Sequence, residues 1–320
     1  MNGADDLDDL RPTVSELDLS RPMRIHVVGV GGAGMRAIAR VLVEMGHEVS
    51  GSDRTPSAHL EALAELGVVV HHGHAAEHVA AADLVTRSTA VGDENPEVTA
   101  ARARGIPVRT RADVLAAISR DRPAILVAGT HGKTTTSSML AVILDEAGRS
   151  PSFVIGSDVD RFGTGARWSG RGETVIEADE SDGTFLALQG AHAIVTSLDP
   201  DHLEFFGSRD RLAAAFAEFV DGIEGVVAVC SDDPDTGPLL GLPGVVTYGT
   251  ATGADLHLSG VELGRATTVA EITWRGEQLG RHTIGLPGLH NARNAAGAAS
   301  IALSLGVDPA AVDRKSTRLN

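Results

Sequence analysis

Several residue types are scarce in this sequence of 320 residues, and each scarcity excludes a class of protein. The single cysteine, Cys230, cannot form an intrachain disulfide and fits a reducing compartment. No run of about 18 apolar residues occurs, so no membrane span is expected. The first 20 residues are acidic, whereas an export signal would be basic and apolar. We therefore expect a cytoplasmic protein.

Positive charge is also scarce, and lysine is nearly absent. The chain has 27 lysines and arginines and 43 acidic residues. The resulting net charge of −16 argues against a nucleic-acid partner. Only Lys133 and Lys315 are lysines. Lys133 lies in a glycine-rich turn, and the chain has almost no other lysine to use there.

The rest of the composition, 42% hydrophobic and 22% charged, is typical of a soluble globular protein. Residues 1–20 predict a flexible acidic tail. From residue 24, apolar strands alternate with helices, which predicts parallel sheets covered on both faces. We expect one unit at 21–120 and a second at 121–312, with strands within 24–30, 48–53, 68–73, 82–90, 124–130, 173–179, 191–199 and 225–233.

The pattern changes near residue 250. Short segments within 250–286 predict antiparallel strands, and the alanine-rich stretch 290–306 predicts a helix. Residues 313–320 carry the second lysine and do not continue an apolar helix pattern. We therefore expect them to be an aberrant end.

Four glycines follow the first predicted strand: Gly29, Gly31, Gly32 and Gly34. Such glycines allow a tight turn and the close approach of a diphosphate to a helix N-terminus, and Asp53 could meet a ribose hydroxyl. A nucleotide sugar or a dinucleotide is expected here. The alternative is a turn needed only for packing, and the spacing alone does not distinguish NAD from another diphosphate.

A second glycine turn, at 129–134, follows the apolar strand expected at 124–130. It resembles a phosphate-binding loop, but Val127 stands where the usual spacing has its first glycine. Lys133 would neutralise the β- and γ-phosphates, and the Thr134 hydroxyl would lie near Mg²⁺. This interpretation is favoured over a turn with an exposed lysine, because strand, turn, lysine and hydroxyls occur in the required order.

Acidic residues follow the next two predicted strands. Glu177 ends an apolar strand, where a carboxylate is rare unless it has a partner. Acids at the carboxyl ends of parallel strands lie beside the crevice where ligands bind. Glu177 and His202 are therefore predicted to be functional, whereas solvated turns remain the favoured reading of Asp179, Glu180, Asp182, Asp199 and Asp201.

These motifs occur in an order that resembles the Mur ligase family, over residues 24 to about 312. The segments that carry the resemblance are GVGGAGM (29–35), GSD (51–53), NPE (95–97), AGTHGKTTT (128–136), EADESDGTFL (177–186), DPDHLEFFGS (199–208) and PGLHNARNA (287–295). The resemblance implies a Rossmann-like domain that binds a UDP-sugar and a P-loop-type ATPase domain with a small antiparallel β element. It also implies a third domain, which we expect to be missing from this chain.

The activity that the resemblance implies is ATP-dependent ligation in peptidoglycan precursor synthesis. An acyl phosphate would activate the lactyl carboxylate of UDP-N-acetylmuramate, and L-alanine would attack it, with ATP and Mg²⁺ required, in a monomer or homodimer. No lysine lies between residues 134 and 314, so the carbamylated lysine of some relatives has no counterpart, as in the alanine-adding branch. Without a third domain, we expect this chain not to complete the reaction.

Three alternatives stay open: a ligase of this family that recycles a tripeptide, a nicotinamide dehydrogenase, and a non-catalytic UDP-sugar-binding module. Arg36 and Arg87 depart from the small or hydroxyl residues that the family more often has there. The histidines at 71–74 are read as strand-end residues near a ligand cleft rather than as metal ligands.

The resemblance also implies site residues. The expected catalytic residues are Lys133, Glu177 and His202, and the expected magnesium ligands are Thr134, Glu177 and His202. The expected ATP contacts are Gly129, Thr130, His131, Gly132, Lys133, Thr134, Thr135, Asn291 and Asn294. The expected UDP-sugar contacts are Gly29, Gly31, Gly32, Gly34, Ser52, Asp53 and Ser88.

Overall fold

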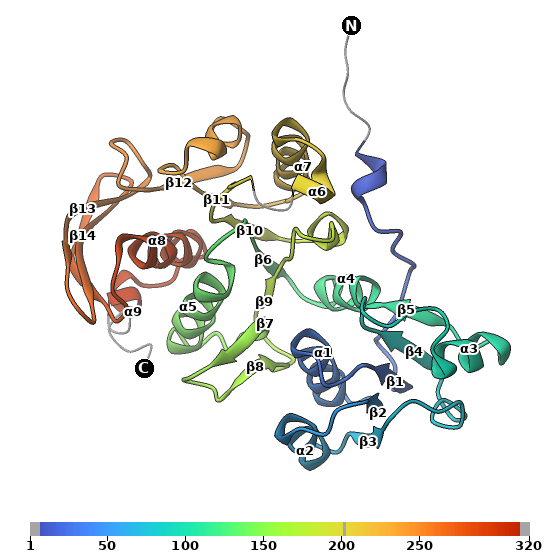
Figure 1. Cartoon of the computed structure of the whole chain (residues 1–320). Coiled ribbons are helices and arrows are strands. Elements are labelled where there is room, and N and C mark those ends of the chain that lie inside the picture. Colours follow the sequence, from blue (N-terminus) through green and yellow to red (C-terminus); the bar gives the residue numbers. More distant parts are fainter. Residues whose placement is uncertain (1–6, 201–202, 314–320) are drawn as a thin grey trace, which may run out of the picture.

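The computed structural model describes residues 7–200 and 203–313, whose strands form two sheets (Figure 1). The five-stranded sheet and its helices form the first domain, and the ten-stranded sheet and its helices form the second. The helix that follows the first strand of the smaller sheet packs against two strands at one edge of the larger sheet. The glycine turn before this helix therefore lies close to the second domain.

The smaller sheet is wholly parallel, with the strand order β3-β2-β1-β4-β5. The order reverses between β1 and β4, and in such sheets ligands bind outside the carboxyl ends of the strands at this point. The strands are β1 (Arg24–Val28), β2 (Glu48–Asp53), β3 (Val69–His72), β4 (Leu84–Arg87) and β5 (Val108–Thr110). The helices are α1 (Ala33–Glu44), α2 (Ala58–Glu65), α3 (Pro96–Ala103) and α4 (Arg111–Asp121).

The larger sheet has the order β15-β14-β13-β12-β11-β10-β6-β9-β7-β8. Its central strands are parallel, and β6 and β11 are buried at every position, because helices cover both faces of the sheet there. These strands are β6 (Ala124–Ala128), β7 (Ser152–Val159), β9 (Thr174–Glu177), β10 (His192–Val195), β11 (Val227–Cys230) and β12 (Val245–Gly249).

Both edges of the larger sheet are antiparallel. At one edge lie β13 (Leu256–Leu263), β14 (Thr268–Trp274) and β15 (Glu277–Ile284), which confirms the antiparallel strands predicted within 250–286. At the other edge, β8 (Thr164–Arg167) pairs with β7. The sequence analysis missed this hairpin, because its glycines and charged residues hide the apolar alternation of a strand.

Helices α5 (Lys133–Glu146) and α8 (Leu289–Ser304) pack against each other over the central strands. The α8 helix confirms the prediction for 290–306. The remaining elements are α6 (Leu203–Phe206), α7 (Arg209–Asp221), α9 (Pro309–Asp313), η1 (Asp8–Leu10), η2 (Thr184–Ala187) and η3 (Pro234–Leu239).

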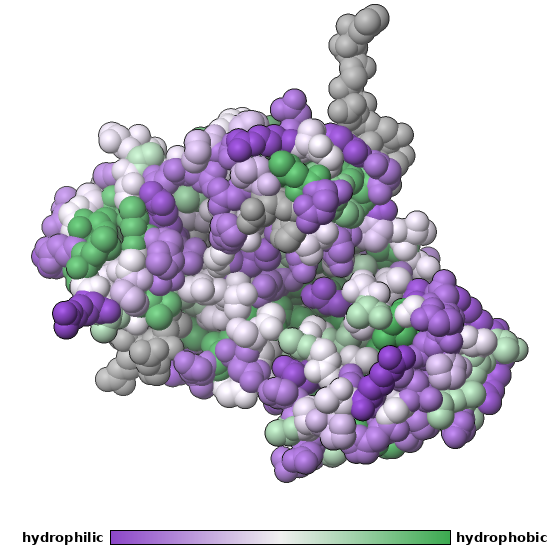
Figure 2. Space-filling view, viewed as in Figure 1, coloured by the Kyte–Doolittle hydropathy of each residue, from purple (hydrophilic) through white to green (hydrophobic). Residues whose placement is uncertain are grey.

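In the face that Figure 2 shows, hydrophilic side chains dominate. No helix of the described residues is long and apolar enough to cross a membrane.

Residues 7–20 do not form the free tail that the sequence predicts. Leu10 and Leu19 are buried in the main hydrophobic core, and the Ser15 N–H donates to Asp113 Oδ1 at 2.6 Å. The leucines interspersed among the acids give this segment an apolar side to pack. Residues 1–6 lie outside the described part of the chain, as does the end predicted at 313–320 apart from Asp313.

Candidate active site at the junction of the two sheets

A cleft of about 340 Å³ joins the two domains at the carboxyl ends of their strands. The first domain contributes the start of α1 and the turn after β4, and the second domain contributes β7 and the residues that end β9. The cleft therefore runs from the glycine turn of the first domain to Glu177, whose carboxylate accepts a hydrogen bond from Thr134 of the predicted phosphate loop. Its lining includes Gly32, Gly34, Ser88, Thr89, Arg111, Gly156, Glu177 and Asp179.

The glycine turn after β1 is held by the end of β2. The N–H groups of Gly29 and Val30 donate to the Ser52 carbonyl oxygen, and the Gly31 N–H donates to Asp53 Oδ2 at 2.9 Å. Gly29 has a φ of +77°, a conformation that favours glycine. Ser88 Cβ lies 3.3 Å from where a Gly29 side chain would begin. The predicted UDP-sugar residues are thus brought together around one turn.

The phosphate loop runs from the end of β6 into α5. The Thr130 N–H donates to the Ser197 carbonyl oxygen, and the Thr130 hydroxyl donates to the Asp199 carbonyl oxygen, which ties the loop to the segment after β10. Gly132 caps α5 in the left-handed region, at a φ of +83°. His131 is 64% exposed, and its Nε2 lies 3.4 Å from Asp199 Oδ2.

Lys133 is folded back over this loop. Its Nζ donates to the carbonyl oxygen of Gly129 at 2.8 Å and to Glu180 Oε2 at 2.7 Å. The side chain of Lys133 is 14% exposed and that of Glu180 is 2% exposed. The sequence reading of Glu180 as a solvated turn acid is therefore wrong, because its carboxylate is buried against the lysine.

Glu177 ends β9 beside the phosphate loop. Thr134 Oγ1 donates to Glu177 Oε1 at 2.9 Å, and the Gly156 N–H donates to Oε2 at 2.8 Å. The carboxylate and hydroxyl oxygens of Glu177 and Thr134 are of the kind that Mg²⁺ prefers. The predicted ATP contact Thr135 directly follows Thr134 on the first turn of α5. The third predicted ligand, His202, lies outside the described residues.

The two predicted asparagines of α8 have different surroundings. Asn294 is buried, and its Oδ1 lies 2.5 Å from where a side chain on Gly132 would begin. The Asn291 side-chain amide instead donates to the carbonyl oxygen of Pro287 at 2.8 Å, within its own helix start. Asn294 thus lies beside the phosphate loop, whereas Asn291 lies one turn earlier, at the beginning of α8.

A buried carboxylate lies beneath the glycine turn. Glu97 Oε2 accepts from Ser52 Oγ at 2.6 Å and lies 2.9 Å from His74 Nδ1; Oε1 lies 2.6 Å from His78 Nδ1 and 3.4 Å from His26 Nε2. Burial would raise the pKa of Glu97, but these partners outweigh burial and hold the pKa at about 2. Of the histidines at 71–74, His74 thus shares the Glu97 carboxylate with the Ser52 hydroxyl.

No group of three or more histidine, cysteine or acidic side chains in the described residues is arranged to hold a metal ion. Glu97 was not predicted to be a functional residue, although it lies in the NPE motif (95–97). Arg111, which lines the cleft, was not predicted either. Arg111 directly follows β5, and its place at the carboxyl edge of a parallel strand was a signal that could have identified it.

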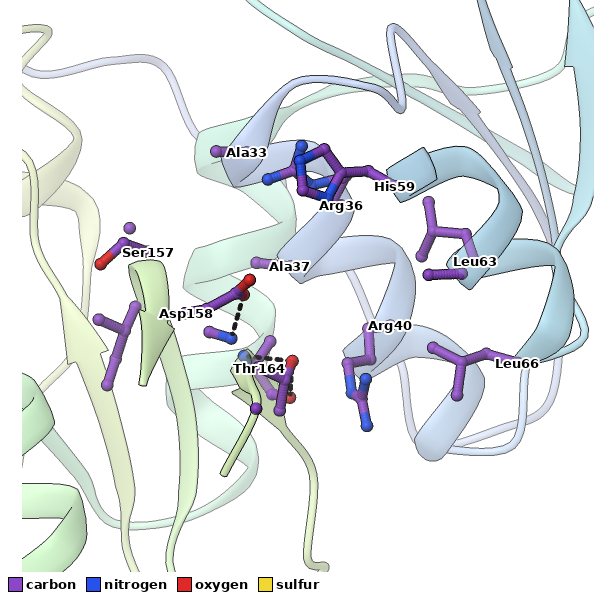
Figure 3. A pocket seen from close by; sticks show the side chains of 16 residues that line it. Ala33, Arg36, Ala37, Arg40, His59, Leu63, Leu66, Ser157, Asp158 and Thr164 are labelled. Carbon is purple, nitrogen blue, oxygen red and sulfur yellow. Dashed lines mark hydrogen bonds between the residues drawn. The ribbon is translucent and has the colours of Figure 1, made fainter. Parts of the chain in front are cut away.

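The two atypical arginines point to different places. Arg87 Nη1 donates to the Val91 carbonyl oxygen at 2.6 Å, within the loop after β4. Arg36 Nη1 donates to the Gly31 carbonyl oxygen at 3.2 Å and lines a small cavity of about 120 Å³ beside the cleft. Figure 3 shows this cavity, with Arg36 on the α1 side and Asp158 on the hairpin side. The glycine turn after β1 is thus formed with both arginines present.

Comparison with known proteins gives two family matches. The model described as "Mur ligase family, catalytic domain" matches residues 24–123, and the model "Mur ligase middle domain" matches residues 127–302. UDP-N-acetylmuramate–L-alanine ligase of Xanthomonas oryzae pv. oryzae is 42% identical over 296 residues, which are 91% of this chain and 62% of that protein. The chain thus spans less than two thirds of the length of this relative.

Solved structures give the same picture. UDP-N-acetylmuramate–alanine ligase from Thermotoga maritima is 31% identical, with a TM-score of 0.82 over 91% of this chain and 67% of that chain. UDP-N-acetylmuramate:L-alanyl-γ-D-glutamyl-meso-diaminopimelate ligase from Neisseria meningitides is 26% identical, with a TM-score of 0.84 over 94% of this chain and 99% of that chain. Both similarities extend across the two sheets and the cleft between them.

Proposed function

The chain belongs to the Mur ligase family, and from this premise we propose that it serves the ATP-dependent ligation of L-alanine to UDP-N-acetylmuramate in peptidoglycan precursor synthesis. The curated relative at 42% identity carries the name of this reaction. The proposal covers the two substrates, ATP and Mg²⁺. The nicotinamide alternative would leave Lys133 and its loop without a role.

One observation carries the proposal: a single cleft is lined by the glycine turn of the first domain and by Glu177 of the second. A sugar nucleotide held at Gly32 and Gly34 can extend along this cleft toward the phosphate loop. Its carboxylate can then meet the terminal phosphate of ATP bound beside Lys133. Bringing two reacting anions together in this way is a positioning task, which accounts for a large part of such catalysis.

The proposed chemistry has two steps. An oxygen of the lactyl carboxylate attacks the γ-phosphorus of ATP, the bond to the β-phosphate oxygen breaks, and ADP leaves. The alanine amine then attacks the carbonyl carbon of the acyl phosphate, and inorganic phosphate leaves with the bonding electrons as the amine loses a proton. The first step is needed because a carboxylate is a poor electrophile without a leaving group.

The residues of the phosphate loop would neutralise charge in the first step. Lys133 would donate to the β- and γ-phosphates, and the backbone N–H groups at the N-terminus of α5, which follows Gly132, would face them. Asn294, beside Gly132, would contact the adenine side of the nucleotide. The exposed His131 would lie close to the second ligand.

We expect Mg²⁺ to bind together with the phosphates of ATP. Thr134 and Glu177 would hold it, because their oxygens lie 2.9 Å apart at the mouth of the phosphate loop, and His202 would hold a second ion. Bound Mg²⁺ would supply positive charge against the phosphate oxygens.

Binding to the 320-residue chain tests the proposal. We expect calorimetry to show binding of UDP-N-acetylmuramate and, with Mg²⁺, of a non-hydrolysable ATP analogue. UDP-N-acetylglucosamine, which lacks the lactyl carboxylate, should bind more weakly when the ATP analogue is present. A chain that binds neither UDP-N-acetylmuramate nor the ATP analogue would contradict the proposal.

The acceptor is tested by phosphate release with L-alanine, other amino acids or the L-alanyl-γ-D-glutamyl-meso-diaminopimelate tripeptide in a chain extended to the length of the relatives. L-Alanine should support release, and the tripeptide should not. The opposite preference would identify the recycling reaction named for the neisserial structure.

A further inference from the structure

Among the described residues that line the interdomain cleft, the charges are unevenly divided. Glu177 and Asp179 contribute two carboxylates from the second domain, and Arg111 contributes a guanidinium from the first. Arg111 is the first residue of α4, directly after β5. The cleft therefore has a positive end beside the first domain and a negative end beside the second.

The half-buried Arg111 side chain has one buried donor without a partner, and its positive charge helps to lower the pKa of Asp179 in the same cleft. Arg111 Nε is buried and has no hydrogen-bond partner within residues 7–200 and 203–313. By contrast, Arg87 pairs with Asp93 at 2.8 Å and bonds the Val91 carbonyl oxygen. A guanidinium has five N–H donors, and burying a charge without a partner is costly. An anionic ligand in the cleft would provide the missing acceptor.

The position of Arg111 indicates which part of a ligand it meets. A side chain on Gly34 would begin 2.9 Å from Arg111 Nε and 3.3 Å from its Cζ. The guanidinium thus lies against the last glycine of the turn, at the first turn of α1. Helix N-terminal N–H groups and an arginine fork on the same side of a cleft both favour a phosphate group.

We propose that Arg111 binds the diphosphate of the sugar nucleotide, a contact that deepens the proposed function and rests on it. The planar fork donates to two diphosphate oxygens, which a lysine or a single N–H cannot reproduce. Since Glu177 and Asp179 repel the diphosphate from the other end of the cleft, Arg111 also sets the direction in which the ligand lies. The sugar and its carboxylate then extend toward the phosphate loop.

The test compares three ligands of the 320-residue chain: UDP-N-acetylmuramate, UDP and uridine. UDP keeps the diphosphate and lacks the lactyl carboxylate, and uridine lacks both. We expect Arg111→Ala to weaken UDP-N-acetylmuramate and UDP by the same factor, about 10- to 100-fold by calorimetry. Uridine binding, followed by NMR titration, should be unchanged, and Arg111→Lys should fall between the wild type and Arg111→Ala.

Arg120→Ala is the matched control, because it removes an exposed arginine from the same helix and should leave all three affinities unchanged. If Arg111→Ala weakens only UDP-N-acetylmuramate, Arg111 binds the carboxylate instead, and the proposal is overturned. Unchanged UDP affinity in both Arg111 variants, or an equal loss of uridine binding, overturns it as well. A wild-type chain that binds UDP but not UDP-N-acetylmuramate contradicts the proposed function alone.

Discussion

The Nζ of Lys133 lies 2.7 Å from Oε2 of Glu180, and both side chains are largely withdrawn from water. The pair joins the phosphate loop after β6 to the segment after β9. Two opposite charges in such a setting hold each other in place, because either one left alone would be poorly solvated. The lysine is thus oriented over its loop before any phosphate arrives.

Replacing this lysine should abolish nucleotide binding. We expect Lys133→Ala to weaken the Mg²⁺-dependent binding of an ATP analogue by at least about 100-fold, because no neighbouring lysine can replace the charge. UDP-N-acetylmuramate affinity should be unchanged, which would show that the first domain is intact. Lys315→Ala, which removes the other lysine of the chain, is the matched control. Near wild-type ATP affinity in Lys133→Ala would contradict the role of the loop.

The ion pair itself predicts a coupling. Lys133→Met and Glu180→Gln should each lower the free energy of unfolding by about 2 kcal/mol or more, because each removes one charge of a buried ion pair. The double variant should lose less than the sum of the two, by about 1–3 kcal/mol. Urea denaturation of the four proteins measures this difference. Strict additivity would mean that the two charges do not stabilise each other.

Glu177 should control the magnesium requirement. Removing its charge with Glu177→Gln takes away one proposed ligand, so the Mg²⁺ concentration for half-maximal binding of the ATP analogue should rise about tenfold or more. Glu224→Gln is the control, because Glu224 is exposed and precedes β11, at the opposite edge of the sheet. Equal Mg²⁺ titrations for both variants would exclude Glu177 from the metal site. The same assay on His202→Ala tests the second predicted ligand.

The Glu97 carboxylate should make stability depend on acid pH. Its pKa falls from an ordinary 4.5 to about 2 in the folded protein, so its stabilising contribution is complete above pH 4.5 and is lost as the pH falls from 4.5 toward 2. Glu97→Gln should cost about 3 kcal/mol at pH 7 and flatten the pH dependence in this window. Glu94→Gln, at an exposed position, is the control and should leave the pH dependence of stability unchanged. An unchanged acid limb in Glu97→Gln would show that the carboxylate is not stabilised by its histidines.

Much of the fold could be predicted because the central strands of both sheets are parallel and contain continuous buried runs. The run AILVA (124–128) is buried at every position, and continuous apolar runs between glycine turns are typical of strands covered on both faces. The predicted strand at 24–30 ends two residues early, at Val28, because Gly29 and Val30 turn back to bond the Ser52 carbonyl oxygen. Such strand ends are where the site lies.

The site could be predicted where a local motif carries the chemistry, and not where partners come together only in three dimensions. Lys133 is recognisable from its own turn, whereas the burial of Glu180 depends on how β9 lies beside β6. Arg111 lies 77 residues from Gly34 along the chain, and no local pattern reveals that they touch. The same holds for Glu97 and Ser52, whose contact requires β2 and α3 to be placed first.

Two glycines of the same turn should differ in how much stability alanine costs. A side chain on Gly32 would meet only the Gly29 carbonyl oxygen, at an ordinary 3.6 Å, whereas one on Gly34 would begin 2.9 Å from Arg111 Nε. We therefore expect Gly32→Ala to change the free energy of unfolding by less than about 0.5 kcal/mol, and Gly34→Ala to lower it by about 1–2 kcal/mol. Urea denaturation without ligand makes the comparison.

The cause is tested by removing the obstacle. In an Arg111→Ala background, the added methyl group of Gly34→Ala meets no guanidinium, and alanine favours a helix by up to about 1 kcal/mol over glycine. The sign of the Gly34→Ala effect should therefore reverse, from destabilising to neutral or stabilising. A cost that persists in this background would place the constraint on Gly34 in the backbone of the turn, and the guanidinium would not be the group that requires a glycine at this position.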